Sequence, residues 1–233
     1  MSKILPSKIG QRLREEFQFE EKPYFDTQPE KESTALIIVD LQNDFLPGGA
    51  LAVPNGDETI PVINQLQKQF DLIVLTQDWH PKNHQSFASS HENKNTYDVI
   101  KLNGMDQVLW PDHCVQGTEG ADISSELDTT KASLIIRKGM EPEIDSYSGF
   151  FDNGKLKSTG LIGYLIEKEI KKVTVCGLAA DFCVYYTAMD ALDQGFDVEI
   201  VINATKAINP DEFEEKLKNF KLKGGTLREF NLN

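Results

Sequence analysis

Six short apolar runs constrain the fold of this chain more than any other feature of its sequence. They are predicted strands, and they cover residues 35–40, 72–76, 133–137, 173–178, 198–203 and 226–230. The first run, ALIIVD, is apolar up to its last residue, which is typical of a strand buried on both faces of a parallel sheet. Such a sheet needs a covering layer on each side.

Segments with helical periodicity separate most of these strands. They cover residues 59–69, 156–170, 182–194 and 211–222. Strands that alternate with helices predict a parallel sheet with helices on both faces. We therefore predict an α/β fold with three layers, α/β/α, and a six-stranded, mainly parallel sheet. Residues 79–131, which contain several Gly, Asn and Pro, are expected to form loops.

The length of 233 residues favours one large α/β domain over two smaller ones. We predict that this domain covers residues 35–233. Residues 1–34 are charged and mixed in character, and they form a predicted N-terminal extension. The extension is either a surface segment that packs on the domain or an arm in an oligomer interface.

The chain is acidic, with 24 Lys and Arg residues, 37 Asp and Glu residues and a formal net charge of −13. This balance argues against a nucleic-acid-binding protein, which needs a basic face, and against a polybasic membrane-surface protein. No stretch approaches the roughly 18 apolar residues of a membrane-spanning helix. Charges also interrupt the first residues, where a signal peptide has its apolar core. We therefore expect a cytoplasmic protein that binds neither nucleic acid nor membrane.

Chemically active side chains follow three of the predicted strands. In an open α/β sheet the active site lies beyond the carboxyl ends of the strands. Asp40 closes the first strand, Lys138 follows the third, and Cys183 follows the fourth after a short turn. Asp40 is either a general base for the thiol or a cap of the next turn. Lys138 is either a cation that keeps Asp40 ionised or a surface lysine.

Cys183 lies in the first turn of a predicted helix. The partial positive charge of a helix N-terminus lowers a thiol pKa and favours the thiolate, and its free N–H groups can form an oxyanion hole. These features predict a nucleophile. The alternative is a buried, inert cysteine like Cys176, which lies in the middle of a strand. The joint placement of Asp, Lys and Cys at strand ends favours the catalytic interpretation.

A possible metal site lies in the region that contains all four histidines, between residues 80 and 113. Asp78 and His80 are two residues apart, so in an extended segment their side chains point the same way. His113 can arrive from the long loop as a third ligand. One Asp and two His, with positions left for water, suit Zn²⁺, Mn²⁺ or Fe²⁺. His84 is either a fourth ligand or a partner of the ligands, and the alternative for the whole group is histidines bonded to loop backbone.

Three aromatic residues, Phe45, Trp79 and Trp110, lie near these segments in the sequence. Their rings would supply a flat apolar pocket. An aromatic substrate would fit such a pocket, whereas the alternative is that the rings only pack against the core.

Six segments of the chain, in this order, resemble the nicotinamidases among the isochorismatase-like cysteine hydrolases. They are Val39-Asp-Leu-Gln-Asn-Asp-Phe45, Gln77-Asp-Trp-His-Pro81, Trp110-Pro-Asp-His-Cys-Val115, Arg137-Lys-Gly139, Asp145-Ser-Tyr-Ser-Gly-Phe150 and Gly177-Leu-Ala-Ala-Asp-Phe-Cys-Val184. Each segment alone is a weak signal, but six in the family's order are specific. The resemblance covers roughly residues 34 to 233 and implies the isochorismatase-like hydrolase fold.

The resemblance also implies an activity, which is the hydrolysis of nicotinamide, and of pyrazinamide in many members, to the acid and ammonia. Such an enzyme serves pyridine nucleotide biosynthesis through NAD salvage. By resemblance, the catalytic triad is Asp40, Lys138 and Cys183. The implied ligands of a divalent metal, often Zn²⁺, that holds the pyridine nitrogen are Asp78, His80 and His113. Family members often form homo-oligomers.

The resemblance further assigns the substrate pocket and the oxyanion hole. Phe45, Trp110 and Tyr147 correspond to walls of the ring pocket, and the backbone N–H groups of Ala179 and Cys183 to the oxyanion hole, with a cis peptide expected at Leu178–Ala179. Ala180 stands where the family often has Thr, and the first 33 or so residues have no counterpart in compact bacterial members. The alternatives are a related cysteine amidohydrolase that acts on a carbamoyl compound, and a non-catalytic module on the same fold.

Overall fold

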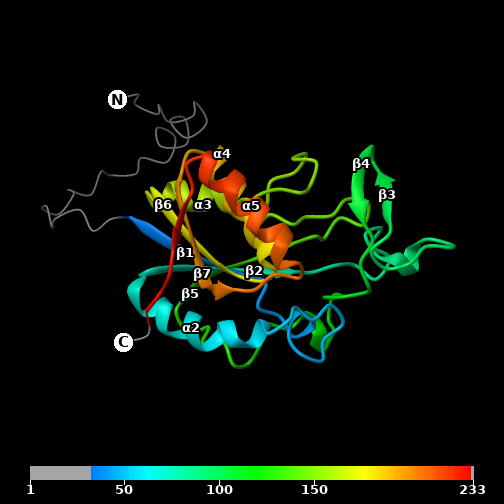
Figure 1. The fold of residues 1–233 in the computed structure, drawn as a ribbon, viewed down its shortest axis with the longest axis horizontal. Coiled ribbons are helices and arrows are strands. Elements are labelled where there is room, and N and C mark those ends of the chain that lie inside the picture. The colour runs from blue at the N-terminus through cyan, green and yellow to red at the C-terminus, as the bar shows by residue number, and fades with distance from the viewer. Residues whose placement is uncertain (1–32, 232–233) are drawn as a thin grey trace, which may run out of the picture. The chain divides into compact units, whose positions relative to one another are not determined.

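A computed structural model describes residues 33–231 of the chain (Figure 1). The predicted N-terminal extension falls almost wholly outside these residues, so the proposed division at residue 34 stays a prediction. Among the described residues, no helix is long and apolar enough to cross a membrane.

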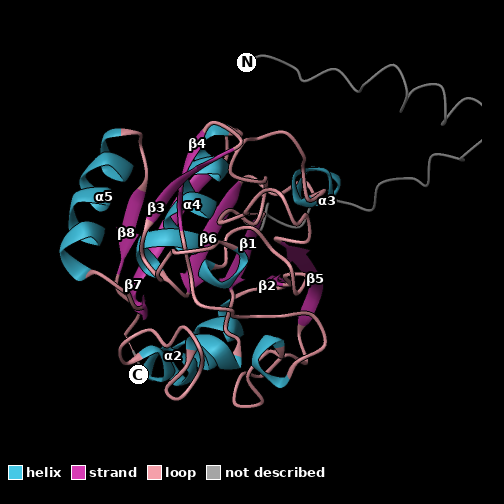
Figure 2. Cartoon of the chain, turned by 90° about the vertical axis from the view of Figure 1, so that its right-hand side faces the viewer, coloured by secondary structure: helices cyan, strands magenta, loops and turns pink. Residues whose placement is uncertain are grey.

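A single six-stranded sheet forms the centre of the described domain, in the order β5-β2-β1-β6-β7-β8. All neighbouring strands in it are parallel, as Figure 2 shows with β5 and β8 at opposite edges. The strands are β1 (Thr34–Val39), β2 (Leu72–Asp78), β5 (Ala132–Lys138), β6 (Lys172–Gly177), β7 (Asp197–Thr205) and β8 (Thr226–Arg228). The prediction of a six-stranded parallel sheet is confirmed, because continuous apolar runs are stable only where both faces are covered.

Helices cover both faces of this sheet, which gives the three predicted layers. They are α2 (Thr59–Leu66) on one face, and α3 (Leu161–Glu167), α4 (Tyr185–Asp193) and α5 (Pro210–Leu222) on the other (Figure 1). Strand β1 shows why the sheet needs a layer on each face. Leu36 and Ile38 pack into one apolar core with α2, whereas Ile37 packs into the second core with the other helices. Successive strand residues point to opposite faces, so one apolar run fills two cores.

Short helical turns complete the secondary structure. Five of them are 3₁₀ turns, at Asn43–Phe45, Gly56–Glu58, Gln67–Gln69, Ala88–Ser90 and Glu119–Ala121. The sixth, Ala180–Val184, is a π-helical turn that leads directly into α4. The sequence predicts an ordinary helix start at residue 182, so this π turn is a difference that bears on the site.

Two further differences concern regions of irregular sequence. The stretch expected to form loops contains an antiparallel hairpin of β3 (Val99–Leu102) and β4 (Met105–Val108). Helix α3 begins later than predicted, because the Asp152 carboxylate accepts backbone N–H groups of Gly154, Leu156 and Lys157 and holds that segment in a turn. Such local side-chain bonds compete with helix formation.

Candidate active site

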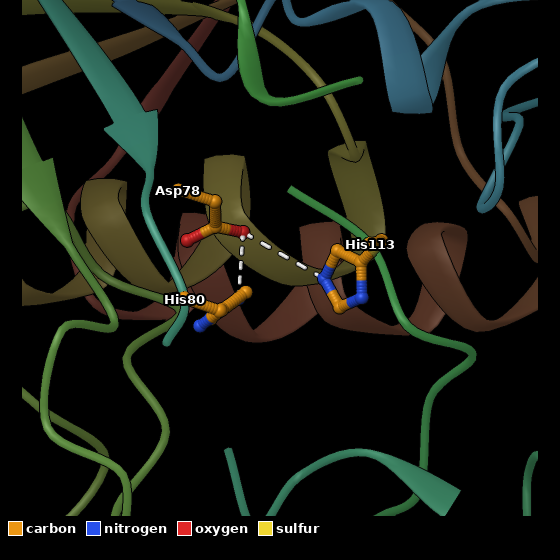
Figure 3. Close-up of side chains that lie close together, drawn as sticks. All are labelled: Asp78, His80 and His113. Carbon is orange, nitrogen blue, oxygen red and sulfur yellow. Dashed lines mark ion pairs between the residues drawn. The ribbon is translucent and has the colours of Figure 1, made fainter. Parts of the chain in front are cut away.

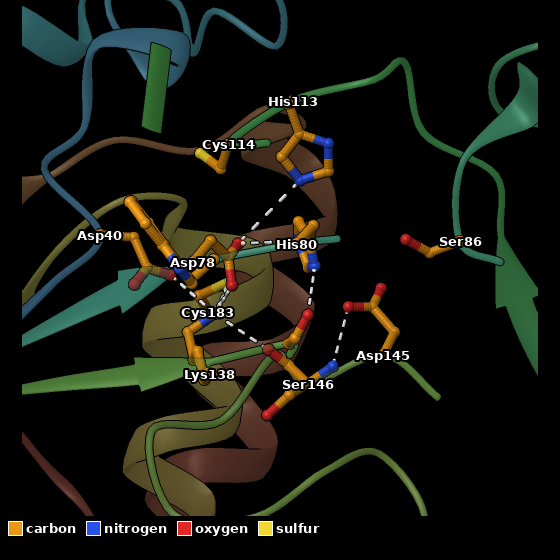
Figure 4. A network of polar contacts seen from close by, with 12 residues as sticks. Asp40, Asp78, His80, Ser86, His113, Cys114, Lys138, Asp145, Ser146 and Cys183 are labelled. Atoms are coloured by element: carbon orange, nitrogen blue, oxygen red, sulfur yellow. Dashed lines mark hydrogen bonds and ion pairs between the residues drawn. The ribbon is translucent and has the colours of Figure 1, made fainter. Parts of the chain in front are cut away.

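The carboxyl ends of four neighbouring strands bring the predicted catalytic and metal-binding residues together (Figure 4). Asp40 follows β1 directly, Asp78 is the last residue of β2, and Lys138 is the last residue of β5. The segment after β6 carries Cys183 in the π turn. This edge of the sheet is where parallel α/β folds bind their ligands.

Lys138 connects the other charged groups of the site. Its Nζ lies 2.8 Å from Asp40 Oδ2 and donates hydrogen bonds to Asp78 Oδ1 at 2.6 Å, to the Ser146 carbonyl at 2.9 Å and to Cys183 Sγ at 3.4 Å. Its side chain is fully buried. The negative charges of Asp40 and Asp78 hold the pKa of Lys138 well above its usual value against the opposing effect of burial. Lys138 is therefore a fixed buried cation and not a surface lysine.

Asp40 is completely buried at the end of β1, with its backbone in the left-handed region at φ 45°. The Thr76 hydroxyl donates to Asp40 Oδ1 at 2.5 Å, and the Asp40 N–H donates back to the Thr76 hydroxyl at 3.2 Å. Burial raises the pKa of Asp40 to about 6, because desolvation outweighs the opposing attraction of Lys138. A carboxyl group with this pKa can both accept and return a proton near neutral pH.

The thiol of Cys183 lies among the same groups, and its Sγ is within 4.8 Å of carboxylate oxygens of Asp40 and Asp78. The sequence predicts a lowered thiol pKa at a helix N-terminus, and this expectation is wrong. Burial raises the pKa of Cys183 well above its usual value, and the nearby Asp40 and Asp78 carboxylates raise it further, whereas Lys138 lowers it. The resting group is the thiol, so a nucleophilic role requires a base.

The pKa of Asp40 predicts the acid limb of any activity that needs this carboxylate as a base. The base must be ionised, and with a pKa of about 6 its ionised fraction falls as the pH drops through 6. We expect kcat/KM to fall about tenfold between pH 7 and pH 5. A pH profile of kcat/KM measures this, because kcat/KM follows the ionisation of the free enzyme, and a plateau that extends unchanged to pH 5 would contradict the assignment of Asp40.

The second group of the site consists of Asp78, His80 and His113, whose possible ligand atoms all lie within 4.8 Å of one another. Figure 3 shows both imidazoles facing the Asp78 carboxylate, with Oδ2 3.6 Å from His80 Nε2 and 4.0 Å from His113 Nε2. His80 Nδ1 is 2.8 Å from the Gly139 carbonyl, and His113 Nδ1 is 2.8 Å from the Pro111 carbonyl.

These backbone bonds decide whether the group fits a metal ion. A carbonyl accepts only from N–H, so Nδ1 carries a proton in both rings, and both Nε2 atoms are directed at Asp78. Burial lowers the pKa of His113 to about 4, whereas the Asp78 carboxylate raises the pKa of His80 against the opposing effect of burial. A divalent cation would take the place of a proton on His80 Nε2, and two imidazoles and one carboxylate, with both Nδ1 atoms bonded to backbone carbonyls, are a donor set that suits such a cation.

His84 lies beside this group, with its ring centroid 4.4 Å from that of His80. Its Nδ1 is bonded to the Ser86 hydroxyl at 2.7 Å, whereas its Nε2 is buried and has no hydrogen-bond partner among the described residues. His80, His84 and Asp145 form a second set of possible ligand atoms within 4.8 Å. Both roles predicted for His84 therefore remain open.

A small cavity reaches both groups, through Cys183 of the first and through Asp78 and His113 of the second. It is lined by Phe45, Leu51, Asp78, Trp110, His113, Asp145, Tyr147, Ala179, Phe182, Cys183 and Ile208. The three predicted wall residues Phe45, Trp110 and Tyr147 all line it, as do Ala179 and Cys183, and the Leu178–Ala179 peptide is cis.

Trp79 differs from the other predicted aromatic residues, because the Arg137 guanidinium stacks over its ring at 3.8 Å and it does not line the cavity. Four wall residues are not predicted from the sequence: Leu51, Asp145, Phe182 and Ile208. Phe182 and Asp145 belong to two of the segments that resemble the nicotinamidases, so their position in those segments could have indicated them as wall residues. Nothing in the sequence pattern distinguishes Leu51 or Ile208 from ordinary core residues.

Comparisons with known proteins show the family of this chain. The Isochorismatase domain matches residues 34–230. A nicotinamidase from Acinetobacter baylyi is 54% identical over 175 residues, which cover 75% of this chain and 82% of the relative. Among solved structures, an Acinetobacter baumanii nicotinamidase and pyrazinamidase is 46% identical, with a TM-score of 0.83 and coverage of 87% of this chain and 98% of the other.

A pyrazinamidase from Pyrococcus horikoshii, solved in complex with zinc, is 39% identical with a TM-score of 0.70, over 85% of this chain and 99% of the other. Both the family match and the identities extend over most of the described domain. The chain belongs to the isochorismatase family.

Proposed function

We propose that this chain is a nicotinamidase, which hydrolyses nicotinamide to nicotinate and ammonia in NAD salvage and also accepts pyrazinamide. One observation carries the proposal: the buried Asp40–Lys138–Cys183 cluster and the Asp78–His80–His113 group face the same small aromatic cavity. The high identity to named nicotinamidases supports the choice of substrate.

The aromatic walls match a flat, neutral ring. Trp110 meets Phe182 edge to face, with ring centroids 4.8 Å apart, and Trp110 Nε1 donates to the Tyr147 hydroxyl at 3.2 Å. These contacts hold the walls in place before a ligand enters. A flat ring that packs against these walls exchanges water for apolar contact, which favours nicotinamide over an aliphatic amide.

The first half of the proposed reaction forms a thioester. Asp40 takes the thiol proton of Cys183 as Sγ bonds to the carboxamide carbon, and the carbonyl oxygen becomes an oxyanion. The N–H groups of Ala179 and Cys183 donate to this oxygen. Asp40 then gives its proton to the amide nitrogen, the C–N bond breaks, and ammonia leaves. Lys138 stays protonated throughout and stabilises each anionic state of Asp40 and Cys183.

The second half returns the enzyme to its resting state. A water molecule gives a proton to Asp40 as its oxygen bonds to the thioester carbon, and the same N–H groups hold the new oxyanion. The C–S bond then breaks, Sγ recovers the proton from Asp40, and nicotinic acid is released and ionises to nicotinate. Asp40 therefore transfers a proton in both halves, from Cys183 to the departing ammonia in the first and from water to Cys183 in the second.

We further propose that Asp78, His80 and His113 hold a divalent metal, with Zn²⁺ as the first choice because a zinc-bound relative shares the fold. When bound, such an ion accepts the pyridine nitrogen lone pair and orients the ring. The chain's own contribution is to direct both Nε2 atoms towards the ion and to hold Cys183 in the wall of the same cavity, because orientation of the amide against the thiol accelerates the attack. The unpartnered Nε2 of His84 serves either as a fourth ligand or as a partner for a bound water.

Gly139 offers a test of the metal group that does not depend on turnover. Its backbone has φ +66°, and a Cβ there would overlap the His80 ring, whose Nδ1 is bonded to the Gly139 carbonyl. We expect Gly139→Ala to weaken metal affinity about 10- to 100-fold, as loss of a ligand's supporting bond does. Competition with a chromophoric chelator measures the affinity.

The matched control for this prediction is Gly104→Ala. Gly104 has a similar φ of +81°, but a Cβ there would meet nothing within 4 Å. It therefore carries the same backbone penalty without the clash. Equal metal affinities for the two variants would contradict the role given to Gly139.

The proposed function is tested by ammonia release from nicotinamide, measured with the metal present, after chelation and after metal is restored. We expect activity that is lost on chelation and recovered with Zn²⁺. Ammonia release from a carbamoyl compound but not from nicotinamide would replace the proposal with the related amidohydrolase, because such a substrate has no ring nitrogen for the metal group.

A further inference from the structure

The segment that carries the nucleophile is tied to the pocket wall by a side chain with no part in the proposed chemistry. Asp181 lies two residues before Cys183 and is completely buried. Its Oδ1 accepts the Ile208 N–H at 3.0 Å, and its Oδ2 accepts the Asn209 N–H at 2.8 Å. One carboxylate therefore uses both oxygens on two successive peptide groups, which fixes their direction as well as their distance.

The peptide groups that Asp181 holds lie at the cavity. Ile208 lines the cavity, as do Phe182 and Cys183. Its neighbour Asn209 caps α5, where its side chain accepts the Glu212 N–H at 3.3 Å. A shift of this loop would therefore move a wall of the cavity and the start of the helix together.

Helix α5 returns to the same segment through Lys216. Its Nζ donates to the Asp181 carbonyl at 2.6 Å and lies 4.6 Å from the centre of the Phe182 ring. A second carboxylate, Glu212, holds this ammonium at 2.7 Å. The π turn is thus held through the side chain of Asp181 and through its backbone carbonyl. The partners of both groups lie in the segment between β7 and the end of α5.

We propose that Asp181 is a positioning residue, which couples the orientation of the Cys183 turn to the placement of Ile208 against the ring of the substrate. The proposal deepens the proposed function and rests on it for the identity of that ring. The Asp181 side chain is completely buried, so no water can replace the two N–H donors on its carboxylate if the loop moves away. Lys216 supports the arrangement from α5, and neither residue contacts the reacting atoms.

The test is Asp181→Asn, which keeps the shape of the side chain but turns one acceptor into a donor that faces an N–H group. A displacement of about 1 Å at a reacting group can cost roughly 100-fold in rate. We expect kcat/KM for nicotinamide to fall about 10- to 100-fold, with kcat lowered and KM raised. A general loss of folded protein would lower the apparent kcat but leave KM unchanged.

A second measurement reports on the reactivity of the Cys183 thiol in the absence of a substrate ring. Alkylation of Cys183 by iodoacetamide, followed on its own peptide by mass spectrometry, is expected to be several-fold slower in Asp181→Asn. This measurement also separates the two proposals. If the wild-type chain releases no ammonia from nicotinamide, the proposed function fails, whereas slower alkylation in the variant still supports the positioning role.

Asp190→Asn is the matched control, because Asp190 is also buried, lies on α4 and forms an ion pair with Lys155 at 2.8 Å away from the cavity. It should leave kcat, KM and the alkylation rate within twofold of wild type. If Asp181→Asn does not fold, Lys216→Met provides the test, with an expected several-fold loss of kcat. Variants of Asp181 and Lys216 with wild-type kcat, KM and alkylation rate would overturn the proposal, as would equal losses in Asp190→Asn.

Discussion

Replacement of Cys183 by alanine is expected to abolish the release of ammonia from nicotinamide. The variant keeps the cavity, the metal group and the buried Asp40–Lys138 pair, but it has no atom that can form the thioester. Removal of a nucleophile costs at least about 10⁴-fold in kcat. We expect this loss while metal content and the binding of nicotinamide stay close to wild type.

Cys176→Ala is the control for this prediction. Cys176 is a free thiol, completely buried within β6, and packs in an apolar core. Its replacement should lower stability by about 1–2 kcal/mol through lost packing and leave kcat within about twofold of wild type. Ammonia release and metal content are measured on the same samples of both variants, which separates loss of the nucleophile from loss of the metal. Turnover by Cys183→Ala at more than a hundredth of the wild-type rate would rule out the proposed nucleophile.

Replacement of Lys138 by methionine is expected to have the largest effect on stability. Met preserves most of the side-chain volume but leaves Asp40 and Asp78 buried without their shared cation. Removal of one partner from a buried ion pair costs about 3–5 kcal/mol. Urea unfolding should show this loss of free energy, and the activity should fall with it because Asp40 is then protonated near neutral pH.

The sign of the pH dependence gives a sharper test of Lys138. Lys138 lowers the pKa of Asp40, so its removal raises that pKa further above the value of about 4 in the unfolded chain. A carboxyl group with a raised folded pKa stabilises the fold when it is protonated, and this stability is lost as the pH rises through the interval between the two pKa values. The loss in Lys138→Met should therefore be smaller at pH 5 than at pH 8.

Lys101→Met is the control for Lys138, because the Lys101–Asp106 pair at 2.8 Å is largely exposed. An exposed ion pair contributes about 0–1 kcal/mol. A loss of stability at Lys138 no greater than that at Lys101 would contradict the account of the buried cluster.

The central sheet could be predicted from the sequence because its strands are apolar on both faces. The apolar run ALIIV in β1 is stable only where a layer of helices covers each face of the sheet. In such a parallel sheet the carboxyl ends of the strands lie at one edge, which brings Asp40 and Lys138 to the same edge. The Asp78–His80 spacing likewise predicted two side chains that face the same way. These features follow from local pattern and one topological rule.

Other features depend on contacts between distant segments, which a local pattern does not encode. In the β3–β4 hairpin only one strand residue, Gln107, is buried, and the strands lack a long apolar run. Ile208 lies at the cavity, and its N–H is bonded to the side chain of Asp181, 27 residues away in the sequence. The pKa of Cys183 was predicted in the wrong direction because burial, which depends on the whole fold, outweighs the effect expected at a helix N-terminus.

The most direct test of the account is to trap the acyl-enzyme. Wild-type protein is mixed with nicotinamide, quenched in acid within a single turnover, and digested, and the peptide that contains Cys183 is examined by mass spectrometry. The account predicts a nicotinoyl thioester on Cys183 that forms and decays at rates consistent with kcat. Ammonia release at the full rate with no acyl group on Cys183 at any quench time would contradict it.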